Sequence, residues 1–310
     1  MRRARTPILD LGYIWLRYLR KHGRFLRVFA PRRYNEKIQW RKLFDFNPVY
    51  ACLSDKFALR DFIVKRIGSE YLVPVLWLGE DVEAIPFDDL TQPFVIKCTH
   101  GNAMNVFVDD PGGVDRSLTK AQLRLWLARD HGRALVEPGH ISLPPRIMVE
   151  PMLRDADGRP PTEYKFFMFD GCAALVAVRL NINHFTHSNL FVTPEWTRTP
   201  IKFDMPRFSG EMPPRPAFYD EMLSLAERIG AGFDHIRVDF LASGNRFFAG
   251  EVSLYPQSGM VPMDPDSYDL WLGEHWRLES PRRRAIAALL GRSAAAPAAS
   301  MRRKRDVPAP

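Results

Sequence analysis

The sequence predicts an α/β protein of the α+β type, in which short strands and amphipathic helices follow one another through a central region. First, its 310 residues suffice for two domains or one large unit with a substantial buried core. Second, a hydrophobic fraction of 46% and a charged fraction of 26% are ordinary for a globular protein and exclude wholesale disorder. Third, β-branched and aromatic runs of strand length alternate with segments of helical periodicity.

Residues 1–33 are predicted to form a basic amphipathic arm that contains a helix. Its apolar positions recur at roughly helical spacing: Ile8, Leu11, Trp15, Leu19 and Leu26. Arginine and lysine residues lie between them, so the helix can rest on an anionic membrane surface or pack on the protein with a solvated basic face. We favour the packed helix, and Pro31 closes the arm.

Helix and strand signals then follow in order. Helices are expected at NEKIQWRKLF and at LSDKFALRDFIVKRIG, the second with Ser54 as its N-cap and Gly68 as its stop. Strands are expected in the runs YLVPVLWLG, PFVIKCTH, PRIMVEPML, EYKFFMFDG and AALVAVRL, with a helix at SLTKAQLRLWLARDHG between the second and third. A helix at RPAFYDEMLSLAERIGAGF precedes a hairpin at 235–256, and the Ala/Pro-rich segment 279–310 is predicted to be a disordered tail.

The net charge of +8 is concentrated at the two ends of the chain. Residues 1–33 hold ten basic residues and one acid, and residues 280–310 hold eight and one. The central 34–279 holds 26 basic and 34 acidic residues, so the body is acidic and no nucleic-acid partner is expected. A basic-tailed interaction protein without catalysis is the alternative from another class.

The cysteines and the hydropathy pattern indicate a cytoplasmic protein. Cys52, Cys98 and Cys172 are odd in number and lack metal-site spacing, which predicts neither a disulfide framework nor a zinc site. No uninterrupted apolar run reaches the roughly 18 residues that a spanning helix needs. The start of the chain also lacks the pattern of an export signal.

The hairpin at 235–256 carries the most unusual polar pattern. Arg237 and Asp239 alternate with apolar residues in the first strand, as do Glu251 and Ser253 in the second. If the connecting loop has an odd number of residues, or a bulge makes up the count, these four side chains share one face. The pattern alone leaves a solvated sheet edge and a functional site equally open.

Other polar residues stand at the ends of predicted strands. Lys97 ends an apolar strand before the loop 100–105, a suitable place to hold phosphate oxygens, although a surface lysine is the simpler alternative. Glu150 ends another strand, where backbone groups can receive a flat heterocycle and Asp155 or Asp157 can receive a sugar. Lys165 interrupts an aromatic strand and should point away from the core.

The order of these motifs resembles the TupA-like ATP-grasp family of teichuronopeptide biosynthesis. The resemblance covers 34–278 and rests on NEKIQW, NPVY, DKFALRDF, FVIKCTHG, YKFFMFDG, RVDF, GEVSLYPQSG and LGEHW. It implies an ATP-grasp fold, two α+β lobes clasping ATP, with a short helical region before them. The implied divisions are an N-terminal part (34–75), a small lid lobe (76–150) and a metal-binding lobe (151–278).

The resemblance also implies nucleotide-binding residues. Lys56 and Lys97 would bind the α- and β-phosphates. The loop with His100, Gly101 and Asn102 would cover the phosphates, although it is poorer in glycine than is usual for the family. The adenine and its sugar would be bound by the remaining members of the set: Glu150, Met152, Leu153 and Asp155.

Metal and catalytic residues are implied in the same way. Asp239 and Glu251 would hold Mg²⁺ or Mn²⁺, because two acids with no lysine to neutralise them suit a cation that prefers oxygen ligands. Ser253 stands where many ATP-grasp enzymes have a metal-binding asparagine, and its hydroxyl is a weaker ligand. Arg237 and Lys165 would act on the transferring phosphoryl group.

The resemblance implies an ATP-dependent carboxylate–amine ligase that forms an acyl phosphate. Its context suggests the modification or biosynthesis of cell-surface polysaccharide, with small-molecule or glycan carboxylates and amines as substrates. A sugar or lipid kinase on the same fold is the closest alternative. The basic ends would allow peripheral contact with an anionic membrane at its cytoplasmic face.

Overall fold

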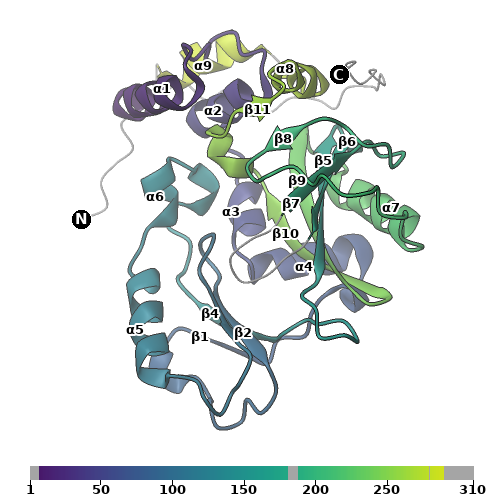
Figure 1. Ribbon diagram of the computed structural model, residues 1–310. Helices are drawn as coiled ribbons and strands as arrows, with labels where there is room; N and C mark the ends of the chain where they lie inside the picture. The colour runs from purple at the N-terminus through teal and green to yellow at the C-terminus, as the bar shows by residue number, and fades with distance from the viewer. Residues whose placement is uncertain (1–6, 181–187, 279, 290–310) are drawn as a thin grey trace. The chain divides into compact units, whose positions relative to one another are not determined.

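The computed structural model describes residues 7–180, 188–278 and 280–289. These residues form helices and three sheets, which confirms the predicted mixed α+β class (Figure 1). The chain divides into two compact units. Unit 1 comprises Met1–Asn47, Thr162–Phe240 and Ser253–Pro310, and unit 2 comprises Pro48–Pro161 and Leu241–Val252. The lobe divisions implied by the resemblance stay a prediction.

Unit 2 is built on a four-stranded antiparallel sheet of order β1-β4-β2-β3. Its strands are β1 (Trp77–Gly79), β2 (Phe94–Cys98), β3 (Asn105–Val108) and β4 (Ile147–Pro151), and its helices are α3 (Val49–Ser54), α4 (Ala58–Ile67), α5 (Arg116–Leu127) and α6 (His131–Leu135). Alternate residues of β2 and β4 point to one face of the sheet and form a hydrophobic core with Leu123 of α5. These residues are Phe94, Ile96, Cys98, Ile147 and Val149. The intervening residues therefore point to the other face, where Lys97 and Glu150 lie.

The predicted single helix beginning at Ser54 is wrong. Ser54 ends α3, and α4 begins at Ala58 after a turn. The carboxylate of Asp55 explains the break, because its Oδ1 accepts the backbone N–H groups of Phe57 and Ala58 at 2.8 and 3.0 Å. The predicted stop at Gly68 is confirmed, and its φ of 111° suits a residue without a Cβ atom.

Unit 1 contains most of a five-stranded sheet of order β10-β9-β5-β6-β7 and a small β11-β8 ladder. Its strands are β5 (Thr162–Phe169), β6 (Cys172–Leu180), β7 (Ser188–Val192), β8 (Lys202–Phe203), β9 (His235–Ser243), β10 (Arg246–Ser253) and β11 (Met263–Asp264), although the hairpin end Leu241–Val252 belongs to unit 2. Helix α7 (Tyr219–Gly230) packs on one face, where Phe166 meets Tyr219 with ring centroids 5.9 Å apart. Lys165 and Asp239 occupy the opposite face, as the two-residue period of strands requires.

Helix α2 (Tyr34–Phe44) is the centre of the helical part of unit 1, because all of its residues are buried. It contacts α1 (Pro7–His22), α8 (Ser267–His275) and α9 (Pro281–Leu289). Its polar residues are paired inside: the Tyr34 hydroxyl lies 3.0 Å from Nε2 of His235, whose Nδ1–H donates to the Met168 carbonyl at 2.8 Å. Arg41 donates to the His235 carbonyl at 2.7 Å, so the helix is joined to the start of β9.

The C-terminal segment differs from the expected disordered tail at its beginning. Helix α9 forms there, and residues 290–310 lie outside the described residues. Three side-chain contacts attach this helix to α2 and its C-cap. Arg284 pairs with Asp45 at 3.0 Å and stacks on the ring of Trp40, whose Nε1–H donates to the Pro281 carbonyl. Tertiary contacts thus overcome the weak helix signal of an Ala/Pro-rich sequence.

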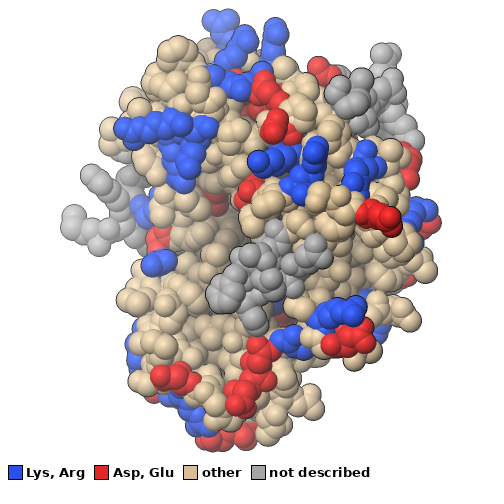
Figure 2. Space-filling view, viewed as in Figure 1, with Lys and Arg blue, Asp and Glu red and all other residues tan. Residues whose placement is uncertain are grey.

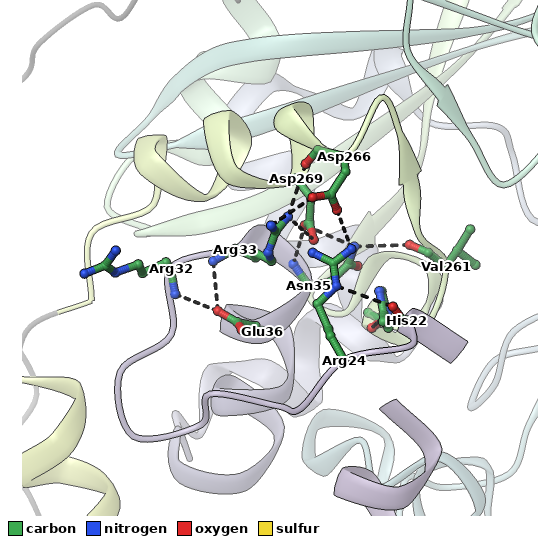
Figure 3. A network of polar contacts seen from close by, with 10 residues as sticks. His22, Arg24, Arg32, Arg33, Asn35, Glu36, Val261, Asp266 and Asp269 are labelled. Atoms are coloured by element: carbon green, nitrogen blue, oxygen red, sulfur yellow. Dashed lines mark hydrogen bonds and ion pairs between the residues drawn. The ribbon is translucent and has the colours of Figure 1, made fainter. Parts of the chain in front are cut away.

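A polar network connects the segment after α1 with α2 and α8 (Figure 3). Arg24 and Arg33 both pair with Asp266, at 2.6 and 2.8 Å. Asp269 is buried, and its Oδ1 accepts the backbone and side-chain N–H groups of Asn35 at 2.9 and 3.1 Å. Burial raises the pKa of the Asp269 carboxyl to about 6. The ionised form of Asp269 is therefore less stable inside the fold than it would be in water.

We predict that Asp269→Asn stabilises the protein at neutral pH. Because the folded pKa lies above the ordinary 3.8, the stability contributed by the protonated carboxyl is present below about pH 4 and lost as the pH rises through about 6. An uncharged amide keeps an acceptor for Asn35 and avoids that loss. Urea unfolding should show the variant about 1 kcal/mol more stable than wild type at pH 7, with a smaller difference near pH 4. A constant difference across this range would contradict the assignment.

Candidate active site

The polar face of the unit 2 sheet holds a carboxylate between two cations. Glu150 on β4 pairs with Lys97 on β2, with Nζ 2.5 Å from Oε2. Its other oxygen, Oε1, lies 3.1 Å from Nη1 of Arg60, which comes from α4. The register explains the first pair: Val95 lies opposite Glu150, and Lys97, two residues further along, points to the same face. Arg60 was not found from the sequence, because nothing local connects α4 with β4.

Lys56 follows the turn that Asp55 organises. The second carboxylate oxygen of Asp55, Oδ2, lies 2.9 Å from Nη2 of Arg146 and 3.4 Å from Oγ1 of Thr99. With Oδ1 capping α4, every lone-pair direction of this buried carboxylate is in use. Asp55 is thus a positioning residue for Lys56, and its place just before a helix was the available sequence signal.

The predicted phosphate-covering loop is tied closely to Lys56. The Lys56 ammonium donates to the Gly101 carbonyl, and its backbone N–H donates to the Thr99 carbonyl at 3.0 Å. His100 is buried, and its Nε2–H donates to the Trp126 carbonyl in α5 at 3.2 Å. Gly101 has little room, since an added Cβ would lie 2.9 Å from Sδ of Met104. The loop is therefore pinned on several sides and needs few glycines.

Burial lowers the pKa of Lys56, and the neighbouring Lys97 lowers it further, whereas Glu251 raises it. Within unit 2, the charge on Lys56 is therefore influenced by the charges of Lys97 and Glu251. The ammonium of Lys56 is less stable there than in water. A bound oxyanion would stabilise it, which is the behaviour expected of a phosphate-binding lysine.

Three histidines lie near Lys56, and the sequence motifs identified only the first of them. They are His100, His131 and His140. The rings of His131 and His140 meet edge to face with centroids 5.2 Å apart. Burial lowers the pKa of all three, that of His140 to about 3, so they are neutral at physiological pH. They add packing around the lysine without adding charge.

The remaining predicted nucleotide residues lie at the end of β4 and in the loop. The Met152 N–H donates to the Pro93 carbonyl at 2.9 Å, which extends the strand by one residue. Leu153 and Asn102 are half-buried. Oδ1 of Asp155 accepts the N–H groups of Asp157 and Arg159 at 3.0 and 2.7 Å, so this carboxylate organises a turn. Its predicted contact with a sugar stays a prediction.

In unit 1, Asp239 lies between Arg237 and Lys165. Arg237 grips it with two hydrogen bonds, Nε to Oδ1 at 2.7 Å and Nη2 to Oδ2 at 2.6 Å. Lys165 on the neighbouring strand β5 places Nζ 2.8 Å from Oδ2. The expectation that no lysine neutralises this acid is wrong, because Lys165 comes from a distant part of the chain. The structure thus brings together three predicted site residues.

The ion cluster extends further along the same face of the sheet. Glu163 lies 2.7 Å from Nζ of Lys165 and 3.0 Å from Nη1 of Arg179 on β6. Arg179 lies directly opposite Glu163 in the β5–β6 register. Nε of Arg179 is buried and has no hydrogen-bond partner among the described residues. The two-residue period of a strand puts Glu163 on the same face as Lys165, and this signal could have identified it. Arg179 could be identified only from the β5–β6 register.

The electrostatics of this cluster keep Asp239 ionised. Burial alone would raise its pKa, but the cations of Arg237 and Lys165 outweigh that effect and hold the pKa at about 2. A carboxylate offers about four lone-pair directions, and these three hydrogen bonds leave one of them for a further partner.

The donor set fits a divalent cation with hard oxygen ligands. Asp239 belongs to unit 1 and Glu251 to unit 2, so their predicted joint role stays a prediction, as does that of Ser253, the last residue of β10. The loop between the two strands has two residues, Gly244 and Asn245, so a shared face for the four hairpin residues requires a bulge. Among the described residues, no three His, Cys, Asp or Glu side chains converge as a metal-binding group. Mg²⁺ in nucleotide sites typically needs only one or two carboxylates beside the phosphates.

The comparisons with known proteins assign the chain to a class. It is an ATP-grasp protein, since residues 36–277 match the family described as TupA-like ATPgrasp. That match spans most of the 310 residues, so the chain belongs to the TupA-like ATP-grasp family, and the resemblance seen in the sequence motifs is confirmed. A comparison with curated proteins gives no match.

A comparison with solved structures matches, among others, two synthetases and one ligase. N5-carboxyaminoimidazole synthetase from Staphylococcus aureus, complexed with ADP, shares 12% identity at a TM-score of 0.42, over 79% of this chain and 53% of that chain. D-alanine–D-alanine ligase from Bacillus anthracis, complexed with ATP, shares 16% identity at a TM-score of 0.40, and the match covers 76% of this chain and 68% of that chain. An ADP complex of N5-carboxyaminoimidazole ribonucleotide synthetase shares 12% identity at a TM-score of 0.41, and the match covers 66% of this chain and 45% of that chain. The chain spans about half the length of the structures matched first.

We predict that Glu150→Gln destabilises the protein more than Lys97→Met. The first change leaves Lys97 and Arg60 together without their carboxylate, which should cost about 2 kcal/mol, less than for a fully buried pair because both cations are partly solvated. The second leaves Glu150 paired with Arg60 and should cost about 1 kcal/mol or less. The double variant should be more stable than the sum of the two losses implies, as measured by urea unfolding. Strictly additive losses would show that the pair does not interact.

Proposed function

We propose that this chain is an ATP-dependent carboxylate–amine ligase that uses Mg²⁺ or Mn²⁺ and acts in the biosynthesis or modification of a cell-surface polysaccharide. One observation carries the proposal: in a member of an ATP-grasp family, Arg237, Lys165 and Asp239 form a single, largely buried ion cluster on one face of the five-stranded sheet. Such a cluster suits the transfer of a phosphoryl group, where charge must be stabilised by groups already in place.

The residues of unit 2 would bind the nucleotide. Lys56 and Lys97 would contact the phosphate oxygens, and the pinned loop would place the backbone N–H groups near Gly101 beside them. Glu150 would keep Lys97 in position through their ion pair rather than contact adenine with its own side chain. The backbone of Met152 and Leu153 would supply hydrogen bonds to the base.

The residues of unit 1 would act on the acceptor and the transferring group. A carboxylate oxygen of the acceptor attacks the γ-phosphorus of ATP, and the bond between that phosphorus and the ADP oxygen breaks. Arg237 and Lys165 stabilise the charge on the phosphoryl oxygens, and Asp239 holds both cations in place. Asp239 and Glu251 would each offer carboxylate oxygens to a divalent cation, which would supply neutralisation of phosphate charge when bound.

An amine then completes the reaction. Its nitrogen attacks the carbonyl carbon of the acyl phosphate, a C–N bond forms, phosphate leaves and the nitrogen loses a proton. Arg179, which pairs with Glu163 in the same ion cluster, would help to hold the acceptor carboxylate through its guanidinium. A uronic acid joined to an amino acid fits this chemistry. A kinase on the same fold is the second candidate, since the same cluster would serve transfer to a sugar or lipid hydroxyl.

A substrate panel distinguishes the two reactions. The protein should form ADP only when both a carboxylate and an amine are supplied, with release of phosphate and a product mass equal to the sum of the substrates minus water. The panel contains uronic acids, amino acids and neutral sugars, each alone and in pairs. A stable phosphoester formed with a single hydroxyl substrate would establish the kinase instead. If no member of the panel, alone or in a pair, supports ADP formation, both activities are contradicted.

We predict that Lys56→Met lowers ATP turnover without lowering stability. Because burial already disfavours the Lys56 ammonium, an apolar side chain of similar length should leave the free energy of unfolding unchanged or raise it. Turnover should fall at least about tenfold, roughly 1.4 kcal/mol of transition-state stabilisation. Glu251→Gln should cause a loss of the same size and raise the Mg²⁺ or Mn²⁺ concentration needed. Lys65→Met, on the exposed end of α4, is the matched control and should retain full turnover. Wild-type turnover in Lys56→Met or Glu251→Gln would remove that residue from the site.

A further inference from the structure

Helix α1 carries a row of large apolar side chains that no described part of the protein covers. Ile8, Leu9, Tyr13 and Leu16 expose 76%, 65%, 49% and 44% of their surfaces. At 100° per residue, the four directions span about 140° of one side of the helix. Isolated exposed leucines are common, but a contiguous apolar side on one helix marks an interaction surface. We call Ile8, Leu9, Tyr13 and Leu16 the outer face of α1.

Packing within unit 1 does not account for the outer face. A different side of the helix, with Ile14 and Tyr18, is completely buried and contacts the neighbouring part of unit 1, including α2. The Nε2–H of His22, at the end of the helix, donates a hydrogen bond to the Gly259 carbonyl at 3.2 Å. The helix is thus fixed by its inner side. The expected packed helix is confirmed, and the outer face remains to be explained.

Basic residues border the outer face. Arg20 and Lys21 are exposed in the last turn of α1, and Arg27 and Arg32 are exposed in the segment after it. Arg24 differs, because it is paired with Asp266 (Figure 3). The only acid in residues 1–33 is Asp10. Phe25, 67% exposed, and Phe29, 40% exposed, continue the apolar surface beyond the helix.

Helix α9 adds charge on the same part of unit 1, since both α1 and α9 pack on α2. Its Arg282 is exposed and lies beside the half-exposed Ile286. Figure 2 shows Lys and Arg side chains gathered over this end of unit 1. The combination of aliphatic side chains with surrounding arginines and lysines therefore characterises the whole end and not only one helix.

We propose that the outer face of α1 docks on the surface of a lipid bilayer that contains anionic lipids. Isoleucine, leucine and tyrosine side chains enter the boundary between headgroups and acyl chains, and the surrounding basic residues meet the anionic headgroups. Helix α1 would lie along the membrane surface rather than across it, because none of the described helices is long and apolar enough to span a membrane. A nucleic acid fits less well, since aliphatic side chains at the centre of the surface do not stack on bases. This docking is independent of the proposed catalysis.

The first experiment changes the apolar side chains of the full-length protein. Leu9→Glu with Leu16→Glu places two acids seven residues apart on the outer face. Leu118→Glu with Leu125→Glu on α5 is the matched control, because these leucines have the same spacing and expose 68% and 62% of their surfaces. Sedimentation with vesicles of phosphatidylserine and phosphatidylcholine should show at least about a tenfold loss of binding for the first pair and no change for the second. Both variants should keep the wild-type melting temperature and ATP turnover in the absence of vesicles.

The second experiment tests the charges. Arg20→Gln with Lys21→Gln should weaken binding about 25-fold, since each basic residue near an anionic surface contributes about fivefold. Lys65→Gln with Arg66→Gln, at the corresponding end of α4, should have no effect. High salt should weaken wild-type binding, because the Debye length falls from about 10 Å at 0.1 M to about 3 Å at 1 M.

Three results would overturn the docking proposal. The first is equal binding to vesicles of pure phosphatidylcholine, and the second is equal loss in the outer-face and control variants. The third is stronger binding to duplex DNA or RNA than to anionic vesicles. If Leu9→Glu with Leu16→Glu does not fold, Leu9→Gln with Leu16→Gln replaces it, and the same comparison with the corresponding glutamines at Leu118 and Leu125 decides. Failure of this proposal would leave the ligase assignment unchanged, since that is measured without vesicles.

Discussion

The pairing of one buried carboxylate with two cations is the interaction on which the candidate site residues of each unit depend. In unit 1, Asp239 is held by Arg237 and Lys165, and in unit 2, Glu150 is held by Lys97 and Arg60. Each acid lies on a sheet face whose reverse side belongs to a hydrophobic core. A charge in that position is too costly to leave alone, so the partner cations contribute to folding. The positions of Arg237, Lys165, Lys97 and Arg60 thus follow from the carboxylate beside each of them.

This arrangement leaves both faces with an excess of positive charge. Along the unit 1 cluster, Arg179, Lys165 and Arg237 outnumber the acids Glu163 and Asp239 by one. In unit 2, the cations Lys56, Lys97 and Arg60 likewise outnumber Glu150 and Glu251 by one. A polyanionic ligand would correct the imbalance without moving the side chains. The acidic overall charge of the central region does not predict this, because local pairing and not the sum of charges determines the potential at a site.

The sequence predicted those features of the site that depend on local periodicity or on an ordered set of motifs. Alternation along single strands put Arg237 with Asp239 and separated Lys165 from the aromatic core. It could not find Arg60 or Arg179, because each is assigned to the site by a partner from another element. The turn after Ser54 was missed for a similar reason: Asp55 signals a helix start, but its second oxygen is committed to Arg146, far along the chain. The apolar pattern seen in α1 included only Ile8 of its exposed side and neither Ile14 nor Tyr18 of its buried side, since spacing alone does not tell which side is buried.

The ion pairs of Asp239 limit what its own substitution can reveal about its predicted metal role. An amide at this position would leave Arg237 and Lys165 close together without an anion, so that loss of activity would combine a folding effect with any effect on a metal. Its pKa of about 2 places the loss of this pairing between about pH 4 and pH 2, where the carboxyl becomes protonated and the stability that it contributes disappears. Glu251 acts on a different group, since its charge raises the pKa of Lys56. Substitution at Glu251 therefore addresses the predicted metal role through a second residue, and measuring the free energy of unfolding together with the cation requirement separates the two effects.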